Sequence, residues 1–138
     1  MENFPTELGI LTCLMILAAS LWIPFIIGIS SEDGEPDNFV RPVDLRTLRP
    51  WVHRAHRAHL NLIEQAVPFA VLVLIIDRMD GFSELTYWTA IVFFWIRVVH
   101  AIGMIAGLIG MPARPIIFLG GWICCMIMAY AVFAAALT

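Results

Sequence analysis

The chain has 138 residues, of which 61% are hydrophobic and 14% are charged. A soluble domain averages roughly 45 to 50% apolar and 25% charged residues, so this composition excludes an ordinary soluble enzyme. The net charge of -3 is too small to favour nucleic acid as a partner. We therefore expect one integral membrane domain over residues 1–138.

Four segments are apolar and long enough to cross a bilayer, for which about 20 residues suffice. They cover residues 8–29, 53–76, 87–109 and 115–137 and leave little chain outside them. The sequence therefore predicts an all-α integral membrane bundle of four transmembrane helices. The first segment is not expected to be a cleavable signal peptide, because residues 1–7 contain glutamates and no basic residue.

The first connection, residues 30–52, is the only long one. It contains the acids Glu32, Asp33, Glu35 and Asp37 and the arginines Arg41, Arg46 and Arg49. Its glycine and prolines favour a solvated linker for the acidic half, and a lid over a site is the alternative.

Basic residues indicate the orientation of the chain. All 8 are arginines, and they concentrate in the first loop, at the start of the second span and in the third loop. The second loop has only Arg78, and neither terminus has any. The positive-inside rule then predicts that the first and third loops are cytoplasmic and that both termini lie outside. We expect a multi-pass protein of the cell (inner) membrane.

The second span carries a polar stripe. Arg54, Arg57, Asn61, Glu64 and Pro68 follow one another at steps of three and four residues, which places them on one face of a helix. A charge at the centre of a membrane helix costs roughly 2.5 to 3.5 kcal/mol on insertion scales, so this face is expected to hold something polar. Pro68 lacks the N–H that would bond the carbonyl of Glu64, and we therefore expect the helix to kink just beyond Glu64.

Arg97 and His100 are three residues apart in the third span and share a face. At about 1.5 Å of rise per residue from the cytoplasmic ends, Glu64 lies roughly 16 Å deep, His100 roughly 15 Å and Arg97 roughly 20 Å. We therefore predict that Glu64 pairs with Arg97 and His100. Arg114 directly precedes Pro115, which suits the first position of the fourth helix, and is expected at the cytoplasmic mouth of the same cavity.

Such a cavity offers guanidiniums for carboxylates, an amide, and a carboxylate for an ammonium group. This set suits a small zwitterionic anion, and the apolar helices around it suit a lipophilic second substrate. Polar contacts between helices, or a water-filled proton path, would explain Glu64, Arg97 and His100 about equally well. No metal site is predicted, since His53 and its neighbours are expected at the membrane interface and the cysteines lack metal spacing.

The polar stripe also resembles a known family. The signature residues are Arg54, Arg57, Ala58, His59, Asn61, Glu64 and Pro68. They resemble the second-helix pattern R-A-H-x-N-x-x-E-x-x-x-P of the MAPEG family, the membrane-associated proteins in eicosanoid and glutathione metabolism, and in particular its bacterial-type microsomal glutathione transferase-like members. Arg97 and His100 resemble the family's R-x-x-H, and Arg114 falls where the enzymes have an arginine opening the fourth span.

The resemblance implies a homotrimer that binds glutathione as a thiol co-substrate between subunits, on the cytoplasmic side. It also implies a conjugation, peroxidase or isomerase reaction on a lipophilic small molecule in the membrane. The implied catalytic residue is Arg114, because a nearby cation favours the thiolate of a thiol whose pKa is about 8.5.

The implied cofactor-binding set consists of Arg54, Arg57, Asn61, Glu64, Arg97 and His100. In the family pattern, Asn61 and Glu64 would hold the peptide part of glutathione, and Arg57 and His100 would support or contact it.

Some positions depart from the family. Leu60, Met104, Pro115 and Phe118 stand where the prostaglandin-synthase branch has polar residues. These departures argue against a dedicated eicosanoid synthase. Two functions are left open, a glutathione-dependent transferase or peroxidase and a non-enzymic lipid-binding protein resembling five-lipoxygenase-activating protein. Retention of the polar stripe together with Arg114 favours the enzyme.

Overall fold

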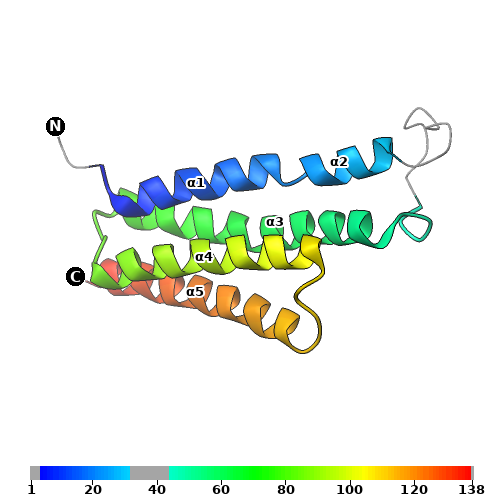
Figure 1. Ribbon diagram of the computed structural model, residues 1–138. Coiled ribbons are helices and arrows are strands. Elements are labelled where there is room, and N and C mark those ends of the chain that lie inside the picture. The colour runs from blue at the N-terminus through cyan, green and yellow to red at the C-terminus, as the bar shows by residue number, and fades with distance from the viewer. Residues whose placement is uncertain (1–3, 32–43, 138) are drawn as a thin grey trace.

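The computed structural model describes residues 4–31 and 44–137, and the secondary structure in this part of the chain is helical (Figure 1). The helices are α1 (Thr6–Ser20), α2 (Ile23–Ser30), α3 (Pro50–Arg78), α4 (Glu84–Ala106) and α5 (Ala113–Ala136). α1 and α2 together form one apolar segment, so the described residues contain 4 helical segments able to cross a membrane. The predicted all-α bundle of four spans is confirmed.

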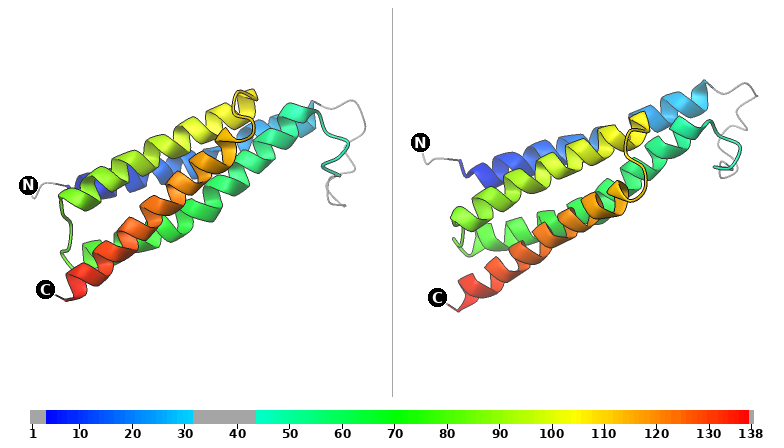
Figure 2. Two further views of the ribbon diagram at one scale, coloured as in Figure 1. Left: turned by 90° about the horizontal axis from the view of Figure 1, so that it is seen from below. Right: turned by 60° about the horizontal axis from the view of Figure 1, so that its bottom comes forward.

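The helices run side by side, and both ends of the chain lie at one end of the bundle (Figure 1, Figure 2). α5 packs against α3 and α4, and α1 packs against the same two helices. α3 and α4 therefore form the centre of the bundle. The acidic half of the first connection and Arg41 lie outside the described residues, so the choice between linker and lid stays a prediction.

α4 begins and ends three residues earlier than the span predicted from hydropathy. It begins there because Ser83 and Thr86 form a capping box, in which each side chain bonds the other residue's backbone N–H. It ends there because Gly107 takes a left-handed conformation with φ 75°, which closes the helix. Hydropathy does not register either signal, because both act through the backbone.

Prolines lie in the first turns of α2 and α5. Pro24 lies at the start of α2, and the first span is interrupted between Ser20 and Ile23 instead of forming one continuous helix. α5 begins at Ala113, so Pro115 occupies its third position and not the predicted first. A proline in the first turn removes no helical hydrogen bond, because the first four N–H groups of a helix have no partner in it. α3 continues as one helix through Pro68.

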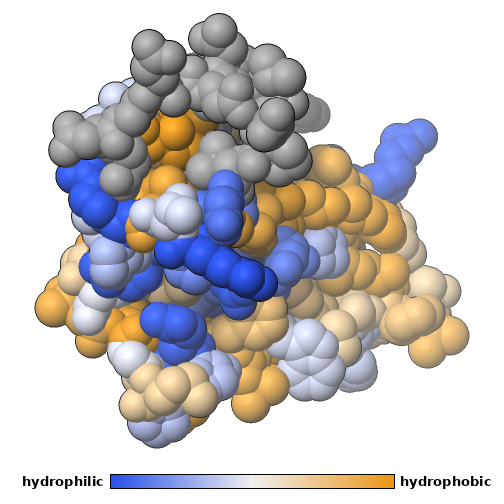
Figure 3. Space-filling model, turned by 90° about the vertical axis from the view of Figure 1, so that its right-hand side faces the viewer, coloured by the Kyte–Doolittle hydropathy of each residue, from blue (hydrophilic) through white to orange (hydrophobic). Residues whose placement is uncertain are grey.

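Most of the buried side chains are apolar, and the outer surface suits lipid. The rings of Phe69 and Phe93 stack with centroids 3.9 Å apart between α3 and α4. Large apolar side chains such as Trp95 and Phe133 are exposed along the outside, as expected where hydrocarbon replaces water. Figure 3 looks at the end that bears the α4–α5 connection, where hydrophilic side chains gather beside the apolar surface.

Candidate functional site

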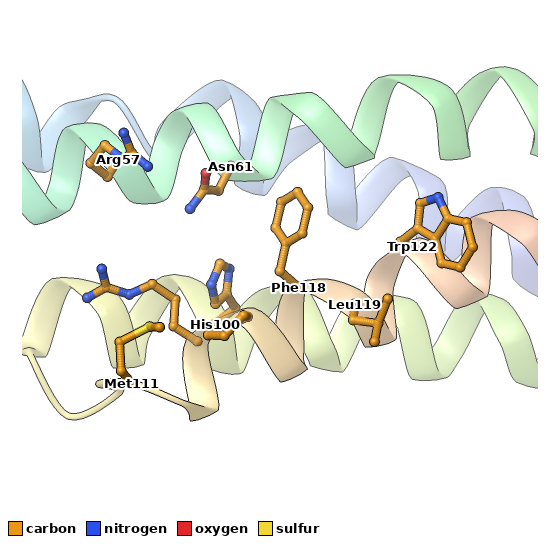
Figure 4. Close-up of a pocket in the computed structure, with 9 residues that line it drawn as sticks. Arg57, Asn61, His100, Met111, Phe118, Leu119 and Trp122 are labelled. Atoms are coloured by element: carbon orange, nitrogen blue, oxygen red, sulfur yellow. The ribbon is translucent and has the colours of Figure 1, made fainter.

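A pocket of about 590 Å³ lies between α3 and α5, with one wall from α4 (Figure 4). Cavities of roughly 300 to 1,000 Å³ are typical of small-molecule sites. Its lining consists of Arg57, Asn61, His100, Met111, Arg114, Pro115, Phe118, Leu119 and Trp122. Polar side chains gather toward one end, and apolar side chains continue the pocket along α5.

Three helices bring the polar end together. Arg57 and Asn61 are one turn apart on α3, His100 comes from α4, and Arg114 lies in the first turn of α5. Figure 4 shows the two α3 side chains on one side of the pocket and His100 on the other. The fold thus collects four of the predicted site residues, which the sequence distributes over separate spans.

The polar atoms of this end are only partly satisfied within the chain. Asn61 Nδ2 donates to Met104 Sδ at 3.5 Å, and Arg114 Nη2 donates to the carbonyl of Ile109 at 3.4 Å. His100 Nε2 and Arg114 Nε are buried and have no hydrogen-bond partner among the described residues. Since about 90% or more of buried polar groups in proteins are paired, such atoms beside a pocket indicate a place for a ligand or for water.

The charges that line the pocket are all positive. Arg57 and Arg114 bring two guanidiniums, and none of the lining residues is acidic. Guanidinium groups bind carboxylates through paired hydrogen bonds, and in a site of low dielectric this interaction is stronger than in water. The polar end is therefore suited to an anion.

Arg54 has a different place from the one predicted. Its Nε donates to the carbonyl of Ile105 at 3.3 Å, and its guanidinium packs against Gly107, where an added Cβ would lie 3.1 Å from Arg54 Cζ. A cation near the carbonyl end of a helix satisfies orphan acceptors and favours the helix dipole. In the described chain Arg54 caps the C-terminal end of α4 and does not line the pocket.

The predicted ion pair between Glu64 and Arg97 is wrong within the described chain. Glu64 is exposed, whereas Arg97 is 1% exposed and donates from Nη2 to the carbonyl of Ile117 at 3.2 Å. The depth estimate took no account of rotation about the helix axis, and the Glu64 side chain is exposed on the single chain. Neither residue lines the pocket.

Gln65 has a buried polar side chain that the helical pattern of the sequence did not single out. It is 5% exposed, faces the interior next to Arg97, and donates from Nε2 to the carbonyl of Phe118 at 2.9 Å. The available signal was a polar side chain in an apolar membrane segment, which is costly unless it has partners. The structure also places three apolar residues in the pocket lining that the sequence did not single out, namely Met111, Leu119 and Trp122.

The histidines at the opening of α3 form no metal site. His56 packs its ring against Phe25 with centroids 4.6 Å apart. Across the described ranges, no group of three or more His, Cys, Asp or Glu side chains could hold a metal ion.

The family model of the MAPEG family matches residues 8–134, nearly the whole chain. The chain belongs to the MAPEG family. MAPEG membership supports a function in glutathione-dependent transfer or peroxidation, or in lipid binding, and together with the helices it makes the chain a multi-pass integral membrane protein. Comparison with curated proteins and with solved structures gave no match.

The pocket of this MAPEG protein has the size and the charge for a small anionic ligand. Its volume and its two guanidiniums suit a ligand with free carboxylates, and His100 adds an imidazole to the lining. A group for the ligand's ammonium is not among the lining residues. The nearest candidate by sequence is Glu64, which follows Asn61 by three residues on α3 and is exposed.

Proposed function

We propose that this MAPEG protein is a glutathione-dependent transferase or peroxidase that acts on lipophilic substrates in the membrane. The observation that carries the proposal is one pocket with two chemically different ends. Arg57, Asn61, His100 and Arg114 form a cationic, hydrogen-bonding end, and apolar side chains of α5 form the other. A thiol peptide and a lipophilic partner could bind side by side in it.

Each polar residue has a role in binding the peptide. Arg57 pairs with a carboxylate, Asn61 bonds the peptide backbone, and the His100 imidazole bonds a polar group of the ligand. Glu64 takes the ammonium group. These contacts hold the peptide so that its thiol lies beside Arg114.

The bound glutathione supplies the nucleophilic sulfur. The Arg114 guanidinium stabilises the negative charge on that sulfur and so lowers the pKa of the thiol from its ordinary value of about 8.5. Each unit of lowering corresponds to about 1.4 kcal/mol. Phe118, Leu119 and Trp122 hold the lipophilic partner next to the sulfur and exclude water, so proximity contributes to the rate.

A homotrimer would complete the site. Arg57 and Glu64 are exposed on the single chain although both lie in a membrane-spanning helix. A charge facing hydrocarbon costs roughly 2.5 to 3.5 kcal/mol near the bilayer centre, which favours covering this face by a second copy. Glutathione would then bind between two subunits. The arginine bias of the loops supports placing the polar end on the cytoplasmic side of the cell membrane.

A non-enzymic lipid-binding role is the second candidate. The observation that favours it is the apolar share of the lining, in which Pro115 and Phe118 bring no polar side chain next to Arg114. Such a protein would bind a lipophilic ligand in the same pocket without consuming a thiol.

Turnover in liposomes distinguishes the two roles. We expect the reconstituted protein to consume glutathione with a lipophilic electrophile or a lipid hydroperoxide, at a rate well above that of protein-free liposomes. Binding of the lipophilic compound without thiol consumption in either assay would favour the lipid-binding role and contradict the enzyme.

A further inference from the structure

A buried polar layer lies directly behind the pocket. It consists of Gln65 of α3 and Arg97 of α4, which are 5% and 1% exposed, and both pack against Gly121 of α5. Neither polar residue lines the pocket. We refer to this pair as the Gln65–Arg97 clamp.

The clamp holds two consecutive carbonyls of α5. Arg97 Nη2 donates to the carbonyl of Ile117 at 3.2 Å, and Gln65 Nε2 donates to the carbonyl of Phe118 at 2.9 Å. These carbonyls follow Arg114 by three and four residues, and such positions lie on the same side of a helix. The clamp therefore fixes the turn of α5 that directly follows Arg114.

Gly121 makes room for the clamp. An added Cβ there would lie 2.7 Å from Arg97 Nη2 and would overlap Gln65 Oε1, so the two side chains could not keep their places. The neighbouring Gly120 differs, because its Cβ would meet only Ile96 Cδ1 at 3.4 Å. An alanine at Gly121 should therefore displace the clamp, whereas an alanine at the adjacent Gly120 should not.

The same helices carry the polar end of the pocket. Gln65 follows Asn61 by one turn on α3, and Arg97 precedes His100 by one turn on α4. The clamp therefore ties α5 to the two helices that hold Asn61 and His100. Its effect is to fix the distance from these residues to Arg114.

The clamp is poorly suited to a purely structural role. Within residues 4–31 and 44–137, Arg97 Nε, Arg97 Nη1 and Gln65 Oε1 are buried without a hydrogen-bond partner. Partly satisfied polar groups in a low-dielectric interior oppose stability, and an apolar pair of similar size would pack the helices better. Rule-breaking groups of this kind are typical of functional sites.

We propose that Gln65 and Arg97 are positioning residues that set the depth and rotation of the first turns of α5, and with them the place of Arg114 beside the bound thiol. The inference rests on the proposed function. Neither residue touches the ligand, and both act through the α5 backbone.

The test compares three variants of the full chain with the wild type. Gln65→Met keeps the length of the side chain and removes its donor, Gly121→Ala displaces both members of the clamp, and Gly120→Ala is the control. The readouts are kcat, KM for glutathione, the melting temperature, and the ultraviolet absorbance of the bound thiolate as a function of pH.

We expect Gln65→Met and Gly121→Ala to lower kcat by roughly 10- to 100-fold, the size of effect that a misplacement of about 1 Å can have. KM for glutathione should change by less than about threefold, because Arg57 and Asn61 still hold the peptide. The thiolate absorbance should appear at higher pH than in the wild type. Gly120→Ala should behave like the wild type in every readout.

Unchanged kcat and an unchanged thiolate titration in Gln65→Met would overturn the inference, and this variant decides it even if Gly121→Ala does not fold. If kcat falls only in proportion to the melting temperature and the thiolate titration does not shift, the clamp only stabilises the packing of the helices and the inference is overturned. If the wild type itself gives no thiolate signal with glutathione, the proposed function fails and this inference with it.

Discussion

Glu64 and Gln65 are neighbours in the sequence but lie about 100° apart around α3, and Glu64 is exposed on the single chain whereas Gln65 is 5% exposed in the bundle interior. The inward amide holds the backbone of α5 behind the pocket. The outward carboxylate has no partner of opposite charge among the described residues and is available to a ligand or to a second copy of the chain. Substitutions on these two faces of α3 should therefore have different effects on ligand affinity and on stability.

Glu64→Gln is expected to lower glutathione affinity by roughly 10- to 100-fold, because a hydrogen bond to a charged group contributes about 1.5 to 3 kcal/mol. The melting temperature of the ligand-free protein in monomer-stabilising detergent should change little, since the side chain is exposed. In a double-mutant cycle with Arg97→Gln, the stability effects should add. A coupling energy above about 1 kcal/mol would show that the two charges do interact.

Arg54 and Arg57 form a matched pair of arginines one turn apart on α3. Arg54→Ala is expected to lower the free energy of unfolding by about 1 kcal/mol through loss of its bond to Ile105, with glutathione affinity unchanged. Arg57→Ala should do the reverse, lowering affinity with little effect on stability. Thermal melts and calorimetric titration of both variants measure the two quantities. An equal loss of glutathione affinity in both variants would show that Arg54 also belongs to the binding site.

Arg114→Ala is expected to lower turnover at neutral pH by roughly 100-fold, the usual effect of removing a group that stabilises a developing anion. The melting temperature should fall far less. The difference from wild type should shrink as the pH rises above about 8.5, because the thiol then ionises without help. Arg78→Ala, an exposed arginine at the C-terminal end of α3, is the control and should keep wild-type activity. If the ratio of the Arg114→Ala rate to the wild-type rate does not change with pH, Arg114 does not stabilise the thiolate.

The orientation of the chain is testable with single cysteines in a background from which the native cysteines have been removed. Arg46→Cys should resist an impermeant thiol reagent in intact cells, whereas Leu137→Cys should react. Both positions are exposed, so accessibility within the protein does not decide the result. The reverse labelling pattern would place the polar end of the pocket outside the cytoplasm.

The sequence predicted where the helices lie in the chain better than which way each helix is rotated about its own axis. Apolar segments of sufficient length identified the four spans, because a bilayer leaves a hydrophobic helix almost no alternative. Helix ends were less predictable, since the capping box at Ser83 and the left-handed Gly107 act through backbone hydrogen bonds that hydropathy ignores. The interruption of the first span near Pro24 is likewise a local backbone effect.

For the site, helical spacing grouped Arg57 with Asn61, the sequence also placed His100 and Arg114 at the same cavity, and the structure brings these four residues to one pocket. Depth alone could not show that Glu64 faces outward while Gln65 faces Arg97, because the rotation of α3 is fixed by packing against α4 and α5. The apolar end of the pocket was not predictable either. Leu119 and Trp122 differ from other membrane-facing residues only in their position relative to α3.

Glutathione binding to the pocket is the central claim, and thermal melting of the detergent-solubilised protein tests it most directly. A ligand at 100 times its Kd stabilises the folded state by roughly 2.7 kcal/mol, so glutathione should raise the melting temperature of the wild type measurably. The double variant Arg57→Ala/Asn61→Ala should lose this increase while keeping a similar melting temperature without ligand. No increase at any glutathione concentration, or an equal increase in the double variant, would contradict the account.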